Sequence, residues 1–275
     1  MKIYISSDME GSTGVVSREQ VDSAAPEYAL GRAMQRADIR TVIRAVLDEA
    51  DADQIILNDA HCHMTNIDIA DLGAEVCLIS GTPKLLGMVE GAQDCDAAFF
   101  IGYHAMAGTE KAVLDHTFDP ETIYDLRING RRMGETGVNA LLCGALGVPV
   151  AMVSGDEALR MEAQSLLGPE VAAVAVKEGL GRCAASCATP ENSSGLLYEG
   201  VKKAMKNLRS GLIKPLVPEL PCVMEVTLLD TLQTDAASLV PGAVRIAART
   251  LRFETQEALE LRRFLYSVME CAGRV

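Results

Sequence analysis

The first sixty residues of the chain follow the order strand, helix, strand. Isoleucines alternate with other side chains in residues 2–7, apolar residues recur at spacings of three and four in residues 28–50, and residues 54–60 form a short apolar run. Alternation is typical of a strand, and the three-four spacing is typical of an amphipathic helix. Two strands joined by a helix of this length are expected to lie parallel. We therefore predict an α/β fold, with a mainly parallel sheet and helices on both faces.

The chain continues this alternation for about another 150 residues. Further strands are expected at 75–81, 97–103, 149–154 and 171–177, helices at 83–91, 135–146, 157–167 and 188–208, and a hairpin at 123–133. The hairpin is predicted from Asn129-Gly130, a pair that favours a two-residue turn. A chain of 275 residues with 49% hydrophobic content can bury the core that such a sheet needs.

A proline-rich segment divides the chain. Three prolines between residues 214 and 221 cannot continue a helix and are typical of an extended connector. Two strands, at 222–229 and 243–252, and a helix at 255–271 are expected beyond it. We predict an α/β domain over 1–213 and a smaller C-terminal α+β region over 214–275.

Two acids follow the first strand directly. Asp8 and Glu10 are two residues apart and precede Gly11. Side chains at i and i+2 leave a strand on the same face, so both acids should project from its carboxyl end. Ligands bind at that edge in open α/β sheets. Two like charges this close repel each other unless a cation lies between them, so the pair indicates either a divalent cation or two solvated acids in a turn.

Histidines follow two further strands of the predicted sheet. All four histidines of the chain lie between residues 61 and 116, and His61 and His104 come directly after strands. The carboxyl ends of parallel strands share one edge, so both should converge on the two acids. Carboxylate and imidazole suit zinc, and with Glu135 the set could hold two ions with a bridging acid. Paired metals recur in hydrolases, which makes hydrolysis the leading reaction class.

Each of these residues also has a plainer interpretation. His61 and His63 could be loop histidines, and Glu135 could be present because an acid at a helix N-terminus is favoured. His116 could form a surface pair with the acid before it. Asp59 could cap the end of its strand, or it could orient the ring of His61 without binding the metal itself.

Four motifs occur in an order that resembles the D-aminopeptidase family of binuclear zinc metallopeptidases. They are Ser7-Asp8-Met9-Glu10-Gly11, Asn58-Asp59-Ala60-His61, Gly102-Tyr103-His104-Ala105 and Gly134-Glu135-Thr136-Gly137-Val138-Asn139-Ala140. The resemblance implies that two zinc ions per chain are bound by Asp8, Glu10, His61, His104 and Glu135. It implies a catalytic role for His116. It also implies an aminopeptidase that releases N-terminal residues, D-amino acids by preference, from short peptides, and that assembles into stacked pentameric rings.

Charge and composition exclude several partners. The chain holds 25 Lys and Arg against 38 Asp and Glu, a formal charge of −13, so it should repel nucleic acid and anionic lipid. No apolar run approaches the roughly 18 residues that cross a bilayer. The first strand begins at once, which leaves no room for a signal peptide, and the eight cysteines are scattered without a C-x-x-C pair. We expect a cytoplasmic protein that binds neither nucleic acid nor membrane, and the family resemblance implies a homo-oligomer.

Two other function classes use the same residue types. A metal-dependent phosphohydrolase would also gather Asp, Glu and His around two ions, but the four motifs contain no lysine or arginine to bind phosphate. A ring protein that is stabilised by metal could bind peptides without cleaving them. Turnover of a dipeptide would distinguish an enzyme from such a peptide-binding protein.

Overall fold

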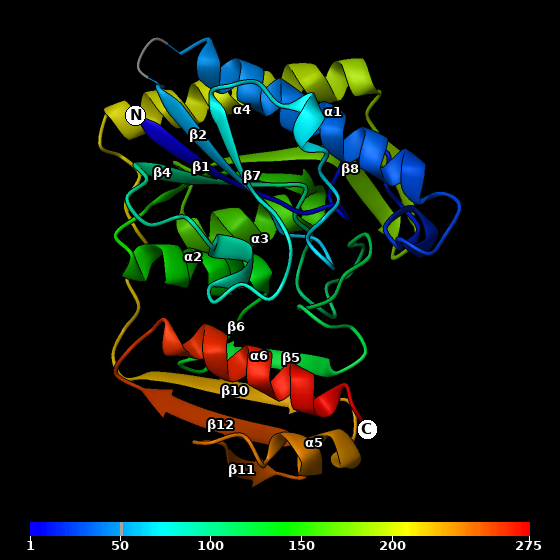
Figure 1. The fold of residues 1–275 in the computed structure, drawn as a ribbon, viewed down its shortest axis with the longest axis vertical. Coiled ribbons are helices and arrows are strands. Elements are labelled where there is room, and N and C mark those ends of the chain that lie inside the picture. Colours follow the sequence, from blue (N-terminus) through cyan, green and yellow to red (C-terminus); the bar gives the residue numbers. More distant parts are fainter. Residues whose placement is uncertain (50–51) are drawn as a thin grey trace.

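Strand β1 lies between β2 and β4 in a seven-stranded sheet of the computed structural model, which describes residues 1–49 and 52–275 (Figure 1). The order of the strands is β3-β2-β1-β4-β7-β8-β9, and all pairs are parallel except β8 with β9. The strands of this sheet are β1 (Lys2–Ser7), β2 (Gln54–Asp59), β3 (Val76–Ile79), β4 (Ala97–Ile101), β7 (Val150–Asp156), β8 (Ala172–Gly181) and β9 (Ala184–Cys187).

Helices cover both faces of this sheet. On one face lie α1 (Tyr28–Leu47) and α4 (Pro190–Arg209), and on the other α2 (Glu135–Ala145) and α3 (Glu157–Leu167) (Figure 1). Local signals fix where these helices begin. The Asp156 carboxylate accepts a hydrogen bond from the backbone N–H of Leu159 at the start of α3, and Pro190 opens α4. The predicted mainly parallel sheet with helices on both faces is confirmed.

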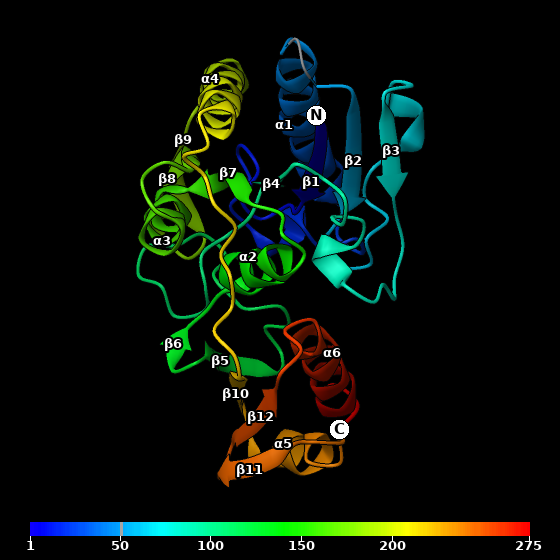
Figure 2. The same ribbon diagram turned by 90° about the vertical axis from the view of Figure 1, so that its left-hand side faces the viewer.

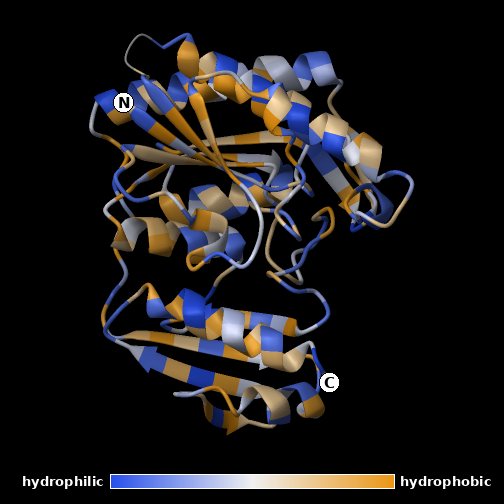
Figure 3. Cartoon of the chain, viewed as in Figure 1, coloured by the Kyte–Doolittle hydropathy of each residue, from blue (hydrophilic) through white to orange (hydrophobic). Residues whose placement is uncertain are grey.

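The core lies between the sheet and these helices. Four residues on the adjacent strands β1, β2 and β4 are fully buried, as expected where helices cover both faces of parallel strands: Ile3, Ile5, Leu57 and Phe99. Figure 3 shows these strands as largely hydrophobic, while the outer faces of the helices carry the hydrophilic residues. None of the helices in the described ranges is long and apolar enough to span a membrane.

A second, antiparallel sheet forms the smaller body seen at the bottom of Figures 1 and 2. Its strands, in the order β11-β12-β10-β5-β6, are β5 (Ile123–Ile128), β6 (Arg131–Arg132), β10 (Cys222–Leu228), β11 (Val244–Ala247) and β12 (Thr250–Thr255). Two helices accompany it, α5 (Thr231–Ala237) and α6 (Glu260–Ala272).

The hairpin β5-β6 links the two bodies. Its turn residues Asn129 and Gly130 both have positive φ, as the predicted two-residue turn requires. Strand β5 pairs with β10 of the C-terminal part, so a segment inside residues 1–213 completes the smaller sheet. The division of the chain at residue 214 stays a prediction.

Several predicted elements differ in the structure. The expected helix at 83–91 is only a 3-10 turn, η3 (Gly87–Val89), because Gly87 and Gly91 take positive φ values of 56° and 86°. The single strand expected at 243–252 is two strands, β11 and β12, joined by a turn. The helix expected at 28–50 ends at Leu47, and residue 50 lies outside the described residues. Strand β9 and helix α5 were not predicted.

Candidate metal centre

The loop after β1 carries two acids into contact with the loop after β4. The backbone N–H of Asp8 donates to the Ile101 carbonyl at 2.8 Å, and the N–H of Gly11 donates to the Gly102 carbonyl at 2.8 Å. A Cβ atom at Gly11 would lie 1.8 Å from the Tyr103 carbonyl oxygen, so only glycine permits this approach. The two strand ends are therefore held side by side.

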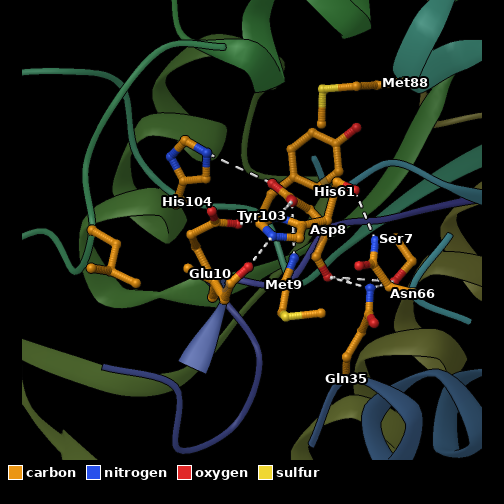
Figure 4. A network of polar contacts seen from close by, with 12 residues as sticks. Ser7, Asp8, Met9, Glu10, Gln35, His61, Asn66, Met88, Tyr103 and His104 are labelled. Carbon is orange, nitrogen blue, oxygen red and sulfur yellow. Dashed lines mark hydrogen bonds and ion pairs between the residues drawn. The ribbon is translucent and has the colours of Figure 1, made fainter. Parts of the chain in front are cut away.

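The predicted acids and histidines form two groups, each of one histidine and two acids, and both groups include Asp8. His61 Nδ1 lies 3.2 Å from Asp8 Oδ1 and 3.1 Å from Glu10 Oε2. His104 Nε2 lies 3.7 Å from Asp8 Oδ2 and 3.2 Å from Glu135 Oε1. Figure 4 shows Asp8 between the two imidazoles, with Glu10 beside them. All five residues are at most 6% exposed, so the sheet edge gathers the whole predicted set.

Backbone carbonyls fix which nitrogen of each histidine faces the acids. His61 Nε2 lies 2.8 Å from the Val21 carbonyl, and His104 Nδ1 lies 3.0 Å from the Ala105 carbonyl. A carbonyl only accepts, so in each ring the nitrogen beside it is the N–H donor. The other nitrogen of the neutral ring then presents a lone pair to the carboxylates. This is the arrangement in which histidines bind metal ions.

The cluster carries more negative charge than its burial allows without a cation. Burial, and then the charge of Glu10, raise the pKa of Asp8 to about 8. Burial alone would lower the pKa of His104, but Glu135 and the two other acids outweigh it and raise this pKa to about 10. Both shifts favour extra positive charge, as protons or as bound cations. Neither Glu10 Oε2 nor His104 Nε2 has a hydrogen-bond partner among the described residues.

These residues fit zinc. A tetrahedral ion with ligand bonds of about 2.0–2.1 Å places its ligand atoms roughly 3.3 Å apart. The distances from each histidine nitrogen to its two carboxylate oxygens, 3.1 to 3.7 Å, bracket that value. Two sets of side chains bring possible ligand atoms within 4.8 Å of one another, namely Asp8, Glu10 and His104, and His104, His116 and Glu135.

His116 lies against this cluster from the loop after β4. Its ring stacks on His104 with centroids 3.9 Å apart, and its Nε2 lies 3.7 Å from Glu135 Oε1. Its Nδ1 lies 2.8 Å from the Leu114 carbonyl. Burial, and then the positive charge of His104, lower the pKa of His116, so its ring is neutral near pH 7. A neutral imidazole at this position can accept a proton.

Two residues near the motifs do not join the cluster. His63 is exposed. Asp59 accepts hydrogen bonds from the backbone N–H groups of Asn66 and Ile67, the second at 2.9 Å, and thereby caps the end of β2. The alternative in which Asp59 orients the His61 ring is wrong, because the Val21 carbonyl holds that ring instead.

A buried lysine that the sequence did not indicate holds the loop of Glu10 in place. Lys177 on β8 is 3% exposed, and its Nζ donates to the carbonyls of Glu10, Ser12 and Val15 at 2.6, 2.9 and 2.5 Å. These acceptors are backbone atoms 162 to 167 residues away in the chain. A residue pattern carries no signal of such contacts.

Comparisons with known proteins agree with this geometry. A family model described as D-aminopeptidase matches residues 1–267. A D-aminopeptidase of Bacillus subtilis (strain 168) is 34% identical over 279 aligned residues, which span 100% of this chain and 98% of that protein. The solved structure of the Zn-dependent D-aminopeptidase DppA from Bacillus subtilis, described as a self-compartmentalizing protease, superposes with a TM-score of 0.95 at 34% identity, covering 100% of this chain and 99% of that one. The family model over residues 1–267 and the full-length similarity in sequence and fold show that this chain belongs to the D-aminopeptidase family.

Proposed function

We propose that the protein is a zinc-dependent aminopeptidase that releases N-terminal residues, D-amino acids by preference, from short peptides. The observation that carries the proposal is the pair of histidine–carboxylate contacts that share Asp8 at the carboxyl edge of the sheet. The solved relative from Bacillus subtilis is described as Zn-dependent, and both relatives are named as D-aminopeptidases.

Two ions per chain agree best with the geometry. Asp8, Glu10 and His61 would hold one ion, and Asp8, His104 and Glu135 would hold the other, with Asp8 between them. Three carboxylates would offset most of the charge of two divalent ions, which accounts for three buried acids at one place. Two such ions supply Lewis-acid chemistry, because they polarise a peptide carbonyl and lower the pKa of water.

His116 would act beside the ions as the proton-transfer group. Its Nε2 is directed at the Glu135 carboxylate, and its lowered pKa leaves it neutral and able to accept a proton. The acids of the cluster would also attract the free amine of the substrate. That contact would restrict cleavage to the first peptide bond.

Assembly belongs to the same proposal. The relative described as a self-compartmentalizing protease supports a homo-oligomer, and the family resemblance suggests stacked pentameric rings. A closed chamber would admit short peptides and exclude folded proteins. We propose the cytoplasm as the site of action.

The decisive experiment compares dipeptides of D- and L-amino acids, each with a free and with an acetylated N-terminus. Zinc-loaded protein should cleave D-Ala-D-Ala faster than L-Ala-L-Ala, and N-acetylation should remove most of kcat/KM because the amine contact is lost. Preference for the L-peptide would contradict only the stereochemical part. Equal cleavage of blocked and free peptides would contradict the aminopeptidase assignment, and cleavage of none of them would favour a peptide-binding role.

A further inference from the structure

A buried arginine of the smaller body has no anion to pair with in the described part of the chain. Arg262 on α6 is 5% exposed, and its Nε and Nη1 atoms have no hydrogen-bond partner. Its guanidinium carbon lies over the ring of Tyr266, 5.1 Å from the ring centroid. Burial of an uncompensated charge is costly, so a guanidinium in this condition indicates a missing anionic partner.

The fold makes room for this guanidinium between the two bodies. A Cβ atom on Gly87 would lie 2.4 Å from Arg262 Nε, so the arginine side chain lies directly on the backbone of η3. The N-terminal end of α6 and η3 approach each other in both ribbon views (Figures 1 and 2). A residue with a side chain at position 87 would displace the guanidinium, so glycine is required there for this contact.

The same guanidinium lies within electrostatic reach of the metal centre. Burial lowers the pKa of Arg262, and the charge of Glu135 is among the groups that raise it. Met88, next to Gly87, accepts a hydrogen bond at 3.3 Å from Asn139 on α2, the helix that Glu135 begins. Two more buried polar atoms of α2, Thr136 Oγ1 and Asn139 Oδ1, have no partner among the described residues. Polar groups without partners therefore occur from the metal centre along α2 toward the arginine.

We propose that Arg262 binds the C-terminal carboxylate of the substrate, so that the enzyme selects dipeptides with a free carboxyl group. This inference rests on the proposed function. A dipeptide carries an amine at one end and a carboxylate at the other, and its extended length is roughly 7 Å. Anchored by its amine at the acids, it would carry its carboxylate away from them toward the arginine. Guanidinium and carboxylate match in shape and charge, and form paired hydrogen bonds.

The test compares a dipeptide with its C-terminal amide in matched variants. Wild-type protein loaded with zinc should cleave D-Ala-D-Ala faster than D-Ala-D-Ala amide. In Arg262→Met the kcat/KM of the acid should fall on the order of 10- to 100-fold, mainly through KM, as expected for the loss of a hydrogen bond between charged groups. The amide should change little, so the preference for the acid disappears. Arg263→Met is the control, because Arg263 is exposed and pairs with Glu260 on the surface of the same helix.

A structural role for Arg262 predicts a different result. If the arginine only joins α6 to η3, Arg262→Met should reduce cleavage of acid and amide by the same factor, and that outcome would overturn the proposal. Should the methionine variant fail to fold, Arg262→Lys keeps the charge but not the paired geometry. It should show an acid-to-amide ratio between those of wild type and no preference, and an unchanged ratio would count against the contact.

A binding measurement separates this proposal from the proposed function. Calorimetry with the reduced-bond analogue of D-Ala-D-Ala, which cannot be cleaved, should show weaker binding when its carboxylate is amidated, and this difference should vanish in Arg262→Met. Wild-type enzyme that cleaves and binds acid and amide equally would refute the role of Arg262 while the aminopeptidase assignment stands. A protein that cleaves neither peptide would refute the assignment, and the calorimetric comparison would still decide whether Arg262 binds a carboxylate.

Discussion

The imidazole rings of His104 and His116 stack with 12° between their planes, and both turn Nε2 toward the same carboxylate oxygen, Glu135 Oε1. One oxygen thus faces two histidines at 3.2 and 3.7 Å. His104 is nearer and is 2% exposed, whereas the side chain of His116 is 14% exposed. This difference suits a ligand and a neighbouring proton-transfer group, respectively.

Removal of His116 should separate chemistry from metal binding. We expect His116→Ala to retain its zinc and to lose on the order of 10²-fold or more in kcat, the scale of a positioned acid–base group. Metal content and turnover should be measured on the same preparation. Loss of zinc together with activity would make His116 a ligand instead.

Removal of His104 should empty one of the two proposed zinc sites. His104 contacts both Asp8 and Glu135, so His104→Ala removes a ligand at the side of the site that these acids share. Elemental analysis should find close to two zinc equivalents in the wild type and about one in the variant, because Asp8, Glu10 and His61 remain in place for the other ion. His63→Ala is the matched control, since His63 is exposed and should leave the metal content unchanged. A variant of His104 with its full complement of zinc would contradict the ligand assignment.

Asp38 should make the protein less stable as the pH rises from about 4 to about 6. This α1 carboxylate accepts hydrogen bonds from the backbone N–H and the hydroxyl of Thr13, and burial raises its pKa from 3.8 to about 6. The folded state therefore binds this proton more tightly than the unfolded state. The contribution of Asp38 to the free energy of unfolding is thus full below about pH 4 and is lost between about pH 4 and about pH 6. Asp38→Asn can keep both contacts without ionising.

The measurement is urea unfolding of wild type and Asp38→Asn at pH 4 and pH 7.5, both without zinc. The free energies of unfolding should be similar at pH 4, and the variant should be more stable by about 1–3 kcal/mol at pH 7.5. Taking the difference between the two proteins cancels the titration of the metal centre. A variant that is less stable at pH 7.5 would show that ionised Asp38 stabilises the fold.

The assembly should be larger than a dimer. One chain has a mass of 29.3 kDa, so multi-angle light scattering of the purified protein should return a multiple of this value well above two. A mass of a single chain would refute the oligomer, and a mass other than ten chains would refute stacked pentameric rings.

The sequence predicted the elements whose patterns are strong and local. Helix α3 begins and ends at the predicted residues, and the hairpin turns at Asn129-Gly130, because their signals lie within the elements themselves. The alternation of 243–252 runs through a turn that has neither glycine nor proline, so one strand was predicted where two exist. Strand β9 has an exposed, alanine-rich sequence that carries no such pattern.

The metal centre was predictable for a different reason. Asp8, His61 and His104 each follow a strand, and parallel strands bring their ends to one edge whatever the rest of the fold does. Buried cations outside the four motifs gave no signal. Lys177 acts on backbone carbonyls, and Arg262 comes from the smaller body across the junction at Gly87.

Lys177 ties the loop that carries Glu10 to the sheet, because it donates hydrogen bonds to three backbone carbonyls of that loop. Because β8 anchors the loop from Glu10 to Val15 through protein atoms alone, we expect Glu10 to keep its place without a bound ion. At this acid, zinc would therefore enter a site that folding has already arranged. Chelation and reloading should be reversible at constant backbone structure, and exchange of one divalent metal for another should not require unfolding.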